Sequence, residues 1–480
     1  MSQELSRNLG CILIVGFWAL VSLGDYPAPF IDDMFYIGAA LNLVQHGVFS
    51  NPYCPMLATI GCADHFFANM PLHDYVLAGW LHIFGISTLS FHVLYVLLAL
   101  GCSLLVYRFV ADTRLAWLAA LFIALAVYGL LGGAGLRADA LGLLFLLAGF
   151  DTWQARTFLG HLWRNFFLGL TVITFPNVAL PAMLLSLFGL AHGKLIQGKT
   201  FRQLMPGAIA VAVAYLLCFL IFLLCIDGRL SEFLSGMAKN QQMSALGVRE
   251  RFQFFTPLGI CKWVVPQAGF LLAVAAVYWL GRNDARRREE RLFLALALLL
   301  FGALAISSFS SASGSHMWAF ACLMTLLVFL TRGTWVLPGW LAYTAIFLLA
   351  AFGHDHAAIQ HALADRPPGP EQRNALLTQI AQLQPKRLYL DPYAVRELYD
   401  YRLPPNAYDY ATCSTTGWGG PKSQSDMPSD SVLVVSVGNT LPARHTPNPG
   451  QGRRLLRVFG VTIPALAANP YDLEILDNRD

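Results

Sequence analysis

The chain has 480 residues, of which 56% are hydrophobic and only 12% are charged, and its mean hydropathy is +0.54. This composition excludes an ordinary soluble enzyme and is typical of a membrane protein with several spans. The net charge of +4 is small and comes from Lys and Arg spread over loops, so it does not indicate a nucleic acid partner.

Long apolar runs predict about eleven membrane-spanning helices. The runs cover residues 10–24, 88–110, 115–131, 139–154, 165–176, 178–192, 204–226, 259–280, 292–306, 317–331 and 335–352. Lys and Arg gather in the loops on one side of these runs, whereas the loop 25–87 contains neither. Because cytoplasmic loops collect positive charge, we expect a cytoplasmic N-terminus, an external loop at 25–87 and, after an odd number of spans, an external segment at 353–480.

The first external loop is predicted to hold two short helices. Asp32 can cap a helix that ends at Gly47, and a second amphipathic helix from Pro71 to Gly85 suits the membrane interface. Between them, Cys54 and Cys62 can form a disulfide in an oxidising compartment or remain two free thiols.

Asp32 and Asp33 lie directly after the first span. Burial and mutual repulsion at such a place raise the pKa of one carboxyl group, which can then accept a proton from a hydroxyl. The alternative is that Asp32 only caps the helix and Asp33 only interacts with the positive end of its dipole.

The same loop carries Asp64-His65 and His73-Asp74 with no Lys or Arg nearby. Carboxylates and imidazoles are suitable ligands for a divalent cation, so Asp64 and His65 are candidate metal ligands. The alternative is that the histidines are simply interfacial residues.

Further ionisable residues lie at the outer ends of later runs. Arg137 and Asp139 open the fourth run, and they either bind phosphate and complete an acidic pocket or form an ion pair, Arg137 with Asp139 or with Asp33. Arg249 and Arg251 of the external loop 227–258 suit phosphate oxygens, or else they contact solvent and lipid headgroups. His316 can likewise contact a phosphate or a sugar.

The segment after the last run predicts a small α/β domain. A helix is expected near 371–383, a strand near 387–391, a helix near 392–401, a polar loop near 411–430, and strands near 431–437 and 454–461. The predicted fold is therefore an all-α polytopic membrane module at 1–352 with an extracytoplasmic α/β domain at 353–480.

The first third of the chain resembles the GT-C superfamily of membrane glycosyltransferases, and is similar to its aminoarabinose transferase and protein O-mannosyltransferase families. The resemblance rests on PFIDDMFYIGAALNL at 29–43 with Gly47, NMPLHDY at 69–75 with Phe84-Gly85, and LRAD at 136–139. It implies Asp32 as catalytic base with Asp33 beside it. From the residue types and positions described above, we expect a substrate pocket with Tyr36, His73, Asp74 and Asp139, and donor phosphate binding by Arg137, Arg249, Arg251 and His316.

The resemblance also implies a polyprenyl-phosphate sugar donor and an extracytoplasmic acceptor, expected to be a lipid-linked glycan. We expect the bacterial inner membrane, because the sequence contains no Asn-x-Ser/Thr sequon. The sequence does not call for a particular cofactor, and a divalent cation is an alternative that it leaves open. A soluble nucleotide donor is not indicated, because no phosphate-binding glycine loop is present. A membrane transporter, an O-antigen polymerase or ligase, and a protein O-glycosylating enzyme remain alternatives.

Overall fold

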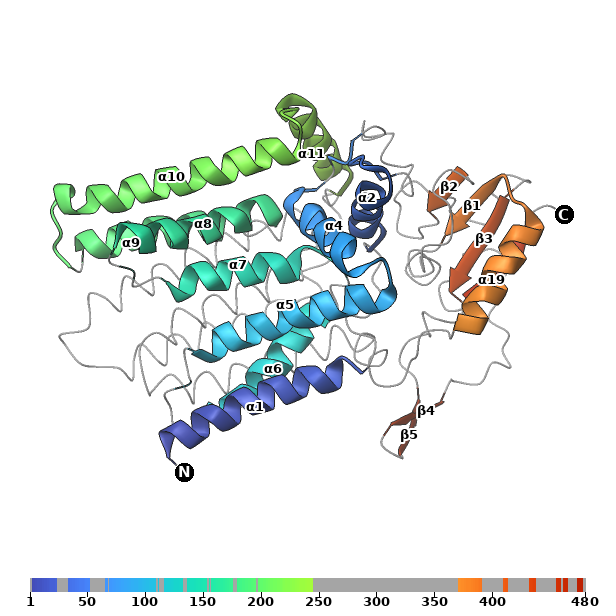
Figure 1. Ribbon diagram of the computed structural model, residues 1–480, viewed down its shortest axis with the longest axis horizontal. Helices are drawn as coiled ribbons and strands as arrows, with labels where there is room; N and C mark the ends of the chain where they lie inside the picture. The colour runs from blue at the N-terminus through green and yellow to red at the C-terminus, as the bar shows by residue number, and fades with distance from the viewer. Residues whose placement is uncertain are drawn as a thin grey trace, which may run out of the picture.

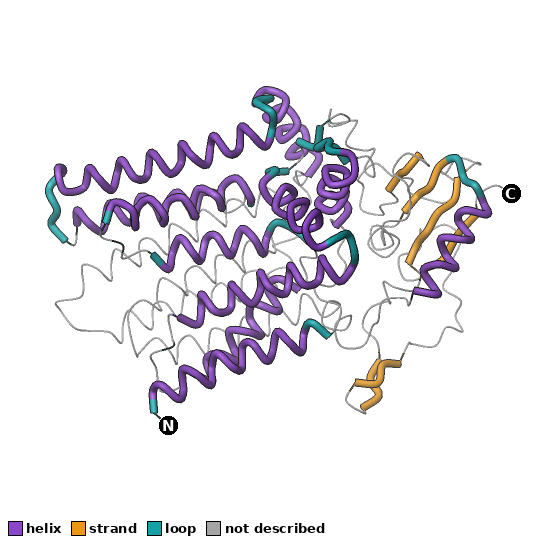
Figure 2. Tube along the Cα trace, in the orientation of Figure 1, coloured by secondary structure: helices purple, strands orange, loops and turns teal. Residues whose placement is uncertain are grey.

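The computed structural model describes most of the chain up to residue 244 and parts of its C-terminal segment (Figure 1). The described residues are 2–23, 33–51, 65–67, 69–108, 111, 116–132, 136–152, 155, 157–175, 179–195, 197–244, 370–390, 409–412, 431–436, 455–458, 461–464 and 473–477. They form a bundle of long helices, two short helices at one end of the bundle, and a separate group of strands with one helix (Figure 2).

The bundle helices coincide with the first seven apolar runs. They are α1 (Gln3–Val21), α5 (Thr88–Arg108), α6 (Ala116–Gly132), α7 (Asp139–Asp151), α8 (Phe158–Thr174), α9 (Ala179–Leu195) and α10 (Phe201–Cys225). Within the described part of the chain, α1, α5 and α10 are long and apolar enough to cross a membrane. The four runs predicted between 259 and 352 lie outside the described residues, so the count of eleven stays a prediction.

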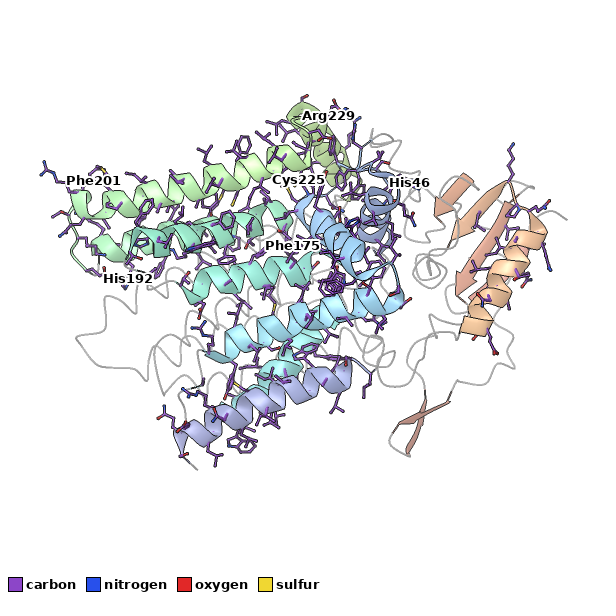
Figure 3. The ribbon with its side chains drawn as sticks, viewed as in Figure 1. His46, Phe175, His192, Phe201, Cys225 and Arg229 are labelled. Atoms are coloured by element: carbon purple, nitrogen blue, oxygen red, sulfur yellow. The ribbon has the colours of Figure 1, made fainter. Side chains whose placement is uncertain are left out.

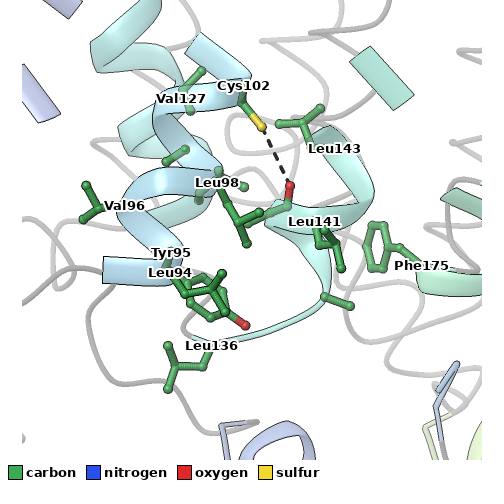
Figure 4. Packing of buried hydrophobic residues seen from close by; sticks show 14 of the residues in the cluster. Leu94, Tyr95, Val96, Leu98, Cys102, Val127, Leu136, Leu141, Leu143 and Phe175 are labelled. Atoms are coloured by element: carbon green, nitrogen blue, oxygen red, sulfur yellow. Dashed lines mark hydrogen bonds between the residues drawn. The ribbon is translucent and has the colours of Figure 1, made fainter. Parts of the chain in front are cut away.

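Helix packing uses small residues and a few buried hydrogen bonds. A Cβ atom at Gly142 would lie 2.7 Å from Phe175, and one at Gly169 would lie 2.6 Å from the Cys218 sulfur, so both glycines permit close helix approach. The Trp18 indole donates to the Ser103 hydroxyl over 2.9 Å and joins α1 to α5. Figure 4 shows the α5–α7 contact, where the Cys102 thiol donates to the Ala140 carbonyl.

Two short helices cover one end of the bundle (Figure 1). They are α2 (Asp33–His46) and α4 (Leu72–Phe84), and the chain leaves them through Gly47 and Gly85, whose φ angles of 71° and 82° favour glycine. Both helices match the sequence expectation for the first external loop. A third helix, α11 (Leu230–Ser244), follows α10 at the same end.

The C-terminal segment contains α19 (Pro370–Leu383) and two small sheets. One sheet has the order β2 (Asp409–Thr412), β1 (Arg387–Leu390), β3 (Ser431–Ser436) and β6 (Leu473–Asp477), in which β1 is parallel to both neighbours and β6 is antiparallel to β3. The other is the antiparallel pair β4 (Leu455–Val458) and β5 (Val461–Pro464).

These elements partly agree with the sequence expectation for the tail. Helix α19 and strands β1 and β3 lie where they were predicted. The single strand expected at 454–461 is wrong, because β4 and β5 are two strands that pair antiparallel. The helix expected near 392–401 lies outside the described residues, and the division into modules at 1–352 and 353–480 stays a prediction.

Candidate active site

The candidate site lies where α2 and α4 meet the bundle. Figure 3 labels His46 of α2, Cys225 at the end of α10 and Arg229 at this end, while His192 and Phe201 lie at the opposite end. Helix α7 also begins here, so the residues of 136–139 approach α4 and α5. Segments that are far apart in the sequence therefore share one end of the bundle.

Helix α4 buries its first turn. Its buried residues are His73, Asp74, Leu77, Ala78 and Leu81, which follow the spacing of one helix face. His73 is 2% exposed and Asp74 is fully buried, so the interpretation of His73 as an interfacial residue is wrong. The other histidine of this helix, His82, is exposed.

His73 has a hydrogen-bond partner at each ring nitrogen. Its Nδ1 atom lies 3.0 Å from Asp74 Oδ1, and its Nε2 atom lies 2.7 Å from the hydroxyl of Tyr95 on α5. The Tyr36 ring of α2 packs edge-on against the imidazole, with 5.4 Å between ring centroids. With both nitrogens engaged, the His73 ring is not open to a metal ion.

Tyr95 connects this pair to the start of α7. Its hydroxyl donates to the backbone carbonyl of Arg137 over 3.1 Å. Figure 4 shows the Tyr95 hydroxyl directed toward the segment at Leu136, which leads into α7. A polar chain thus runs from Asp74 through His73 and Tyr95 to the backbone of Arg137.

Arg137 and Asp139 form a buried ion pair. The Arg137 Nε atom lies 3.0 Å from Asp139 Oδ2, and the two side chains are 5% and 2% exposed. The sequence left open whether Arg137 pairs with Asp139 or Asp33 or instead binds phosphate, and the structure shows the pair with Asp139. Asp139 is also the first residue of α7, where a negative charge interacts favourably with the helix dipole.

Two buried carboxylate oxygens in this region have no hydrogen-bond partner within the described part of the chain. They are Asp74 Oδ2 and Asp139 Oδ1. Buried carboxylate oxygens are normally hydrogen-bonded, so unsatisfied ones are typical of a site that receives a polar group from a ligand or water.

The pKa of Asp74 reflects its burial. Burial raises the pKa of this carboxyl group to about 6, while the hydrogen bond and the charge of His73 lower it. The next residue, Tyr75, has its pKa raised to about 12, mainly by burial. Asp74 can therefore change protonation state near neutral pH, as groups in acid–base sites do.

The structure describes only some of the other predicted site residues. Asp33 is the first residue of α2 and lies one helical turn before Tyr36, which contacts His73. His65 stacks on Phe67 with 5.4 Å between ring centroids. Outside the described residues lie Asp32, Cys54, Cys62, Asp64, Arg249, Arg251 and His316.

No group of three His, Cys, Asp or Glu side chains that could hold a metal ion occurs among the residues that the structure describes. Metal binding by Asp64 and His65 stays a prediction, because Asp64 lies outside those residues. The four described cysteines Cys11, Cys102, Cys218 and Cys225 are free thiols, as expected for small apolar residues of the bundle.

Tyr95 is the site residue that sequence reasoning missed. It lies in an apolar run of α5, where an aromatic residue is normally part of the core, and nothing in the run distinguishes its hydroxyl. The signal that could have found it is the rule that a buried tyrosine hydroxyl needs a polar partner.

Comparisons with known proteins give a structural likeness only. No family model matches the chain, and no curated protein matches its sequence. Among solved structures, the chain is similar to the crystal structure of ArnT from Cupriavidus metallidurans bound to undecaprenyl phosphate, with a TM-score of 0.45 and 14% identity over 89% of this chain and 93% of that chain.

Proposed function

We propose that this protein is a membrane glycosyltransferase that transfers a sugar from a polyprenyl-phosphate carrier to an extracytoplasmic acceptor. The observation that carries the proposal is the buried acid–base cluster at the α2/α4 end of an apolar helix bundle. This cluster combines two incompletely hydrogen-bonded carboxylates with an arginine and a histidine. The acceptor is inferred to be a lipid-linked glycan, and the membrane to be the bacterial inner membrane.

The chemistry of this reaction matches the residue types. Displacement of a polyprenyl phosphate from a sugar needs a base for the acceptor hydroxyl and a cation for the phosphate, but little acid catalysis, because phosphate leaves as an anion. Asp32 is the proposed base, Asp33 lies beside it, and Arg137 is a proposed phosphate ligand. The apolar bundle offers the prenyl chain a place in the membrane.

The position of the cluster favours this function over transport. A transporter is expected to bind its substrate near the middle of the membrane, often between broken helices. Here His73 and Asp74 lie on a 13-residue helix at one end of the bundle, and Asp139 is the first residue of α7. The ionisable residues therefore lie where an enzyme meets a lipid headgroup.

The test is sugar transfer by the purified protein in lipid nanodiscs, using prenyl-phosphate sugars as donors, lipid-linked glycans as acceptors, and parallel reactions with a chelator. We expect transfer by the natural chain and a fall of roughly 10²- to 10⁴-fold for Asp32→Asn, the range for loss of a general base. Glu232→Gln, at an exposed acid on the same end, is the matched control and should keep full activity. Retained transfer by Asp32→Asn would refute the assigned base, and no transfer from any donor would refute the function.

A further inference from the structure

The Tyr95 hydroxyl fixes the tautomer of His73. This hydroxyl carries a single hydrogen, and the Arg137 carbonyl 3.1 Å away can only accept. The Tyr95 hydrogen therefore points to Arg137, and the short 2.7 Å contact requires His73 Nε2 to carry a hydrogen that it donates to Tyr95.

The other side of the ring then holds one shared proton. His73 Nδ1 and Asp74 Oδ1 are 3.0 Å apart, so a hydrogen must lie between them. The pair is either an imidazolium with a carboxylate or a neutral imidazole with a carboxylic acid. In both states the pair has no net charge, which suits its complete burial.

Loss of the shared proton would break the connection to Arg137. The neutral imidazole would then place its one hydrogen on Nδ1, because a hydrogen bond to a carboxylate is the stronger one. Nε2 would become an acceptor and take the hydrogen of Tyr95, and the Arg137 carbonyl would lose its donor. The start of α7, which carries Arg137 and Asp139, would lose one of its anchors.

We propose that His73, Asp74 and Tyr95 form a positioning unit that holds Arg137 and Asp139 in place for the transfer reaction, as long as one proton is shared between His73 and Asp74. The inference rests on the proposed function, because it is the transfer reaction that requires Arg137 and Asp139 to be held in this geometry. The sequence placed His73 and Asp74 in the expected substrate pocket, and the role inferred here for all three residues is to act through Arg137 and Asp139.

Several ionisable groups face this unit and contribute to its proton affinity. They come from α2, α4, the start of α7 and the segment after α10, and all of them remain unchanged in the variants tested below: Tyr36, Tyr75, Arg137, Asp139 and Asp227. Burial raises the pKa of Asp74 and helps the pair to keep its proton.

The experiment is a pH–rate profile of sugar transfer from about pH 5 to about pH 9, a range that brackets histidine titration. The natural chain should lose activity as the pair loses its proton on the alkaline side. Tyr95→Phe removes the donor to Arg137, so we expect a rate about 10- to 100-fold lower, as for a small misplacement of reacting groups, and no alkaline loss. Asp74→Asn should lose the alkaline limb whatever its rate, because its amide can donate to Nδ1 without titrating.

Tyr107→Phe is the matched control on the same helix. The Tyr107 hydroxyl donates to the Arg7 carbonyl over 2.9 Å at the other end of α5, so this variant loses the same kind of bond away from the site. It should keep the natural rate and pH profile.

The outcomes separate the two proposals. If the natural chain is active and both Tyr95→Phe and Asp74→Asn keep its alkaline limb, the positioning unit is overturned and the function stands. If the natural chain transfers no sugar at any pH, the proposed function itself fails, together with the unit that rests on it. If Tyr95→Phe does not fold, the pH–rate profile of Asp74→Asn alone decides whether the positioning unit is overturned.

Discussion

At the scale of single residues, the site is built from charges that are costly to bury. Asp74, Arg137 and Asp139 are each at most 5% exposed. A buried ion pair stabilises a protein weakly as a whole, but removal of one partner leaves the other charge uncompensated. Single substitutions of these residues are therefore expected to lower the free energy of unfolding. The size of the loss depends on whether the remaining partner keeps a buried, uncompensated charge.

The Arg137–Asp139 pair gives the first prediction. Arg137→Met should lower the free energy of unfolding by about 3 to 5 kcal/mol, because the Asp139 carboxylate stays buried without its partner. The double variant Arg137→Met with Asp139→Leu should recover much of this loss. Chemical denaturation of the purified protein in a mild detergent measures both effects.

The chain offers a matched control for that measurement. Arg108 pairs with Asp151 over 2.6 Å, but the Arg108 side chain is 66% exposed, so solvent screens the pair. Arg108→Met should change the free energy of unfolding by only about 0 to 1 kcal/mol. Equal losses in the two single variants would contradict the assignment of Arg137–Asp139 as a buried pair.

Asp74 gives a prediction about pH. Its pKa is raised from 3.8 to about 6 in the folded protein, mainly by burial, so between these values the Asp74 carboxyl group binds more protons in the folded chain than in the unfolded chain. The contribution of this group to the free energy of unfolding should therefore fall as the pH rises from about 4 to about 6, by at most on the order of 3 kcal/mol.

The measurement is the midpoint of thermal unfolding at several pH values for the natural chain and for Asp74→Asn. The asparagine variant should show a smaller decrease across this range, because its side chain does not titrate. An unchanged pH dependence in Asp74→Asn would show that Asp74 is not the buried acid described here.

At the scale of elements, the position of α2 depends on a glycine. A Cβ atom at Gly38 would lie 2.2 Å from the Asn51 side-chain oxygen, so α2 and the segment after it pack without room for a methyl group. Asn42 fixes the same segment, because its amide donates to the Val48 carbonyl over 2.9 Å. The packing of α2 against residues 48–51 is thus set by contacts that larger residues would disturb.

Gly38→Ala is therefore expected to destabilise the protein by about 1 to 3 kcal/mol through overpacking, and to lower transfer activity by displacing α2. Gly79→Ala on the neighbouring helix α4 is the control, since a Cβ atom at Gly79 would meet nothing within 4 Å. This control should be neutral or up to about 1 kcal/mol more stable, because alanine favours the helix. Thermal unfolding and transfer assays on both variants test the difference.

Sequence patterns predicted elements better than contacts between elements. Seven apolar runs and the two short helices with their terminal glycines were predictable, because hydropathy and glycine at positive φ are local signals. The burial of His73 and the role of Tyr95 were not, since both depend on how α4 and α5 pack. The Arg137–Asp139 pair was predictable as one of two pairings, because its partners are two residues apart.

At the scale of the whole molecule, the proposed function requires the cluster to face away from the cytosol. Helix α10 provides the clearest reference for this orientation. It has 25 residues, which at 1.5 Å per residue is about 37 Å and exceeds the roughly 30 Å of bilayer hydrocarbon. We therefore expect the two segments that flank α10 to lie on opposite sides of the membrane.

A native lysine lies near each end of α10. Lys194 is exposed near the end of α9, and Lys239 is exposed on α11, at the same end of the bundle as α2 and α4. We expect a membrane-impermeant amine reagent to modify Lys239 but not Lys194 in intact spheroplasts, and to modify both after the membrane is permeabilised. Peptide mass spectrometry of the purified chain reads out both sites, and Lys239→Arg provides a control for peptide assignment.

The result bears directly on the chemistry of the site. Positive charge is concentrated at the Lys194 end, which cytoplasmic loops favour, and the α2/α4 end carries the acid–base cluster. If Lys194 reacts in intact spheroplasts and Lys239 does not, the cluster faces the cytosol. Transfer to an extracytoplasmic acceptor would then be impossible at this site, whatever the activity of the purified protein toward prenyl-phosphate sugars.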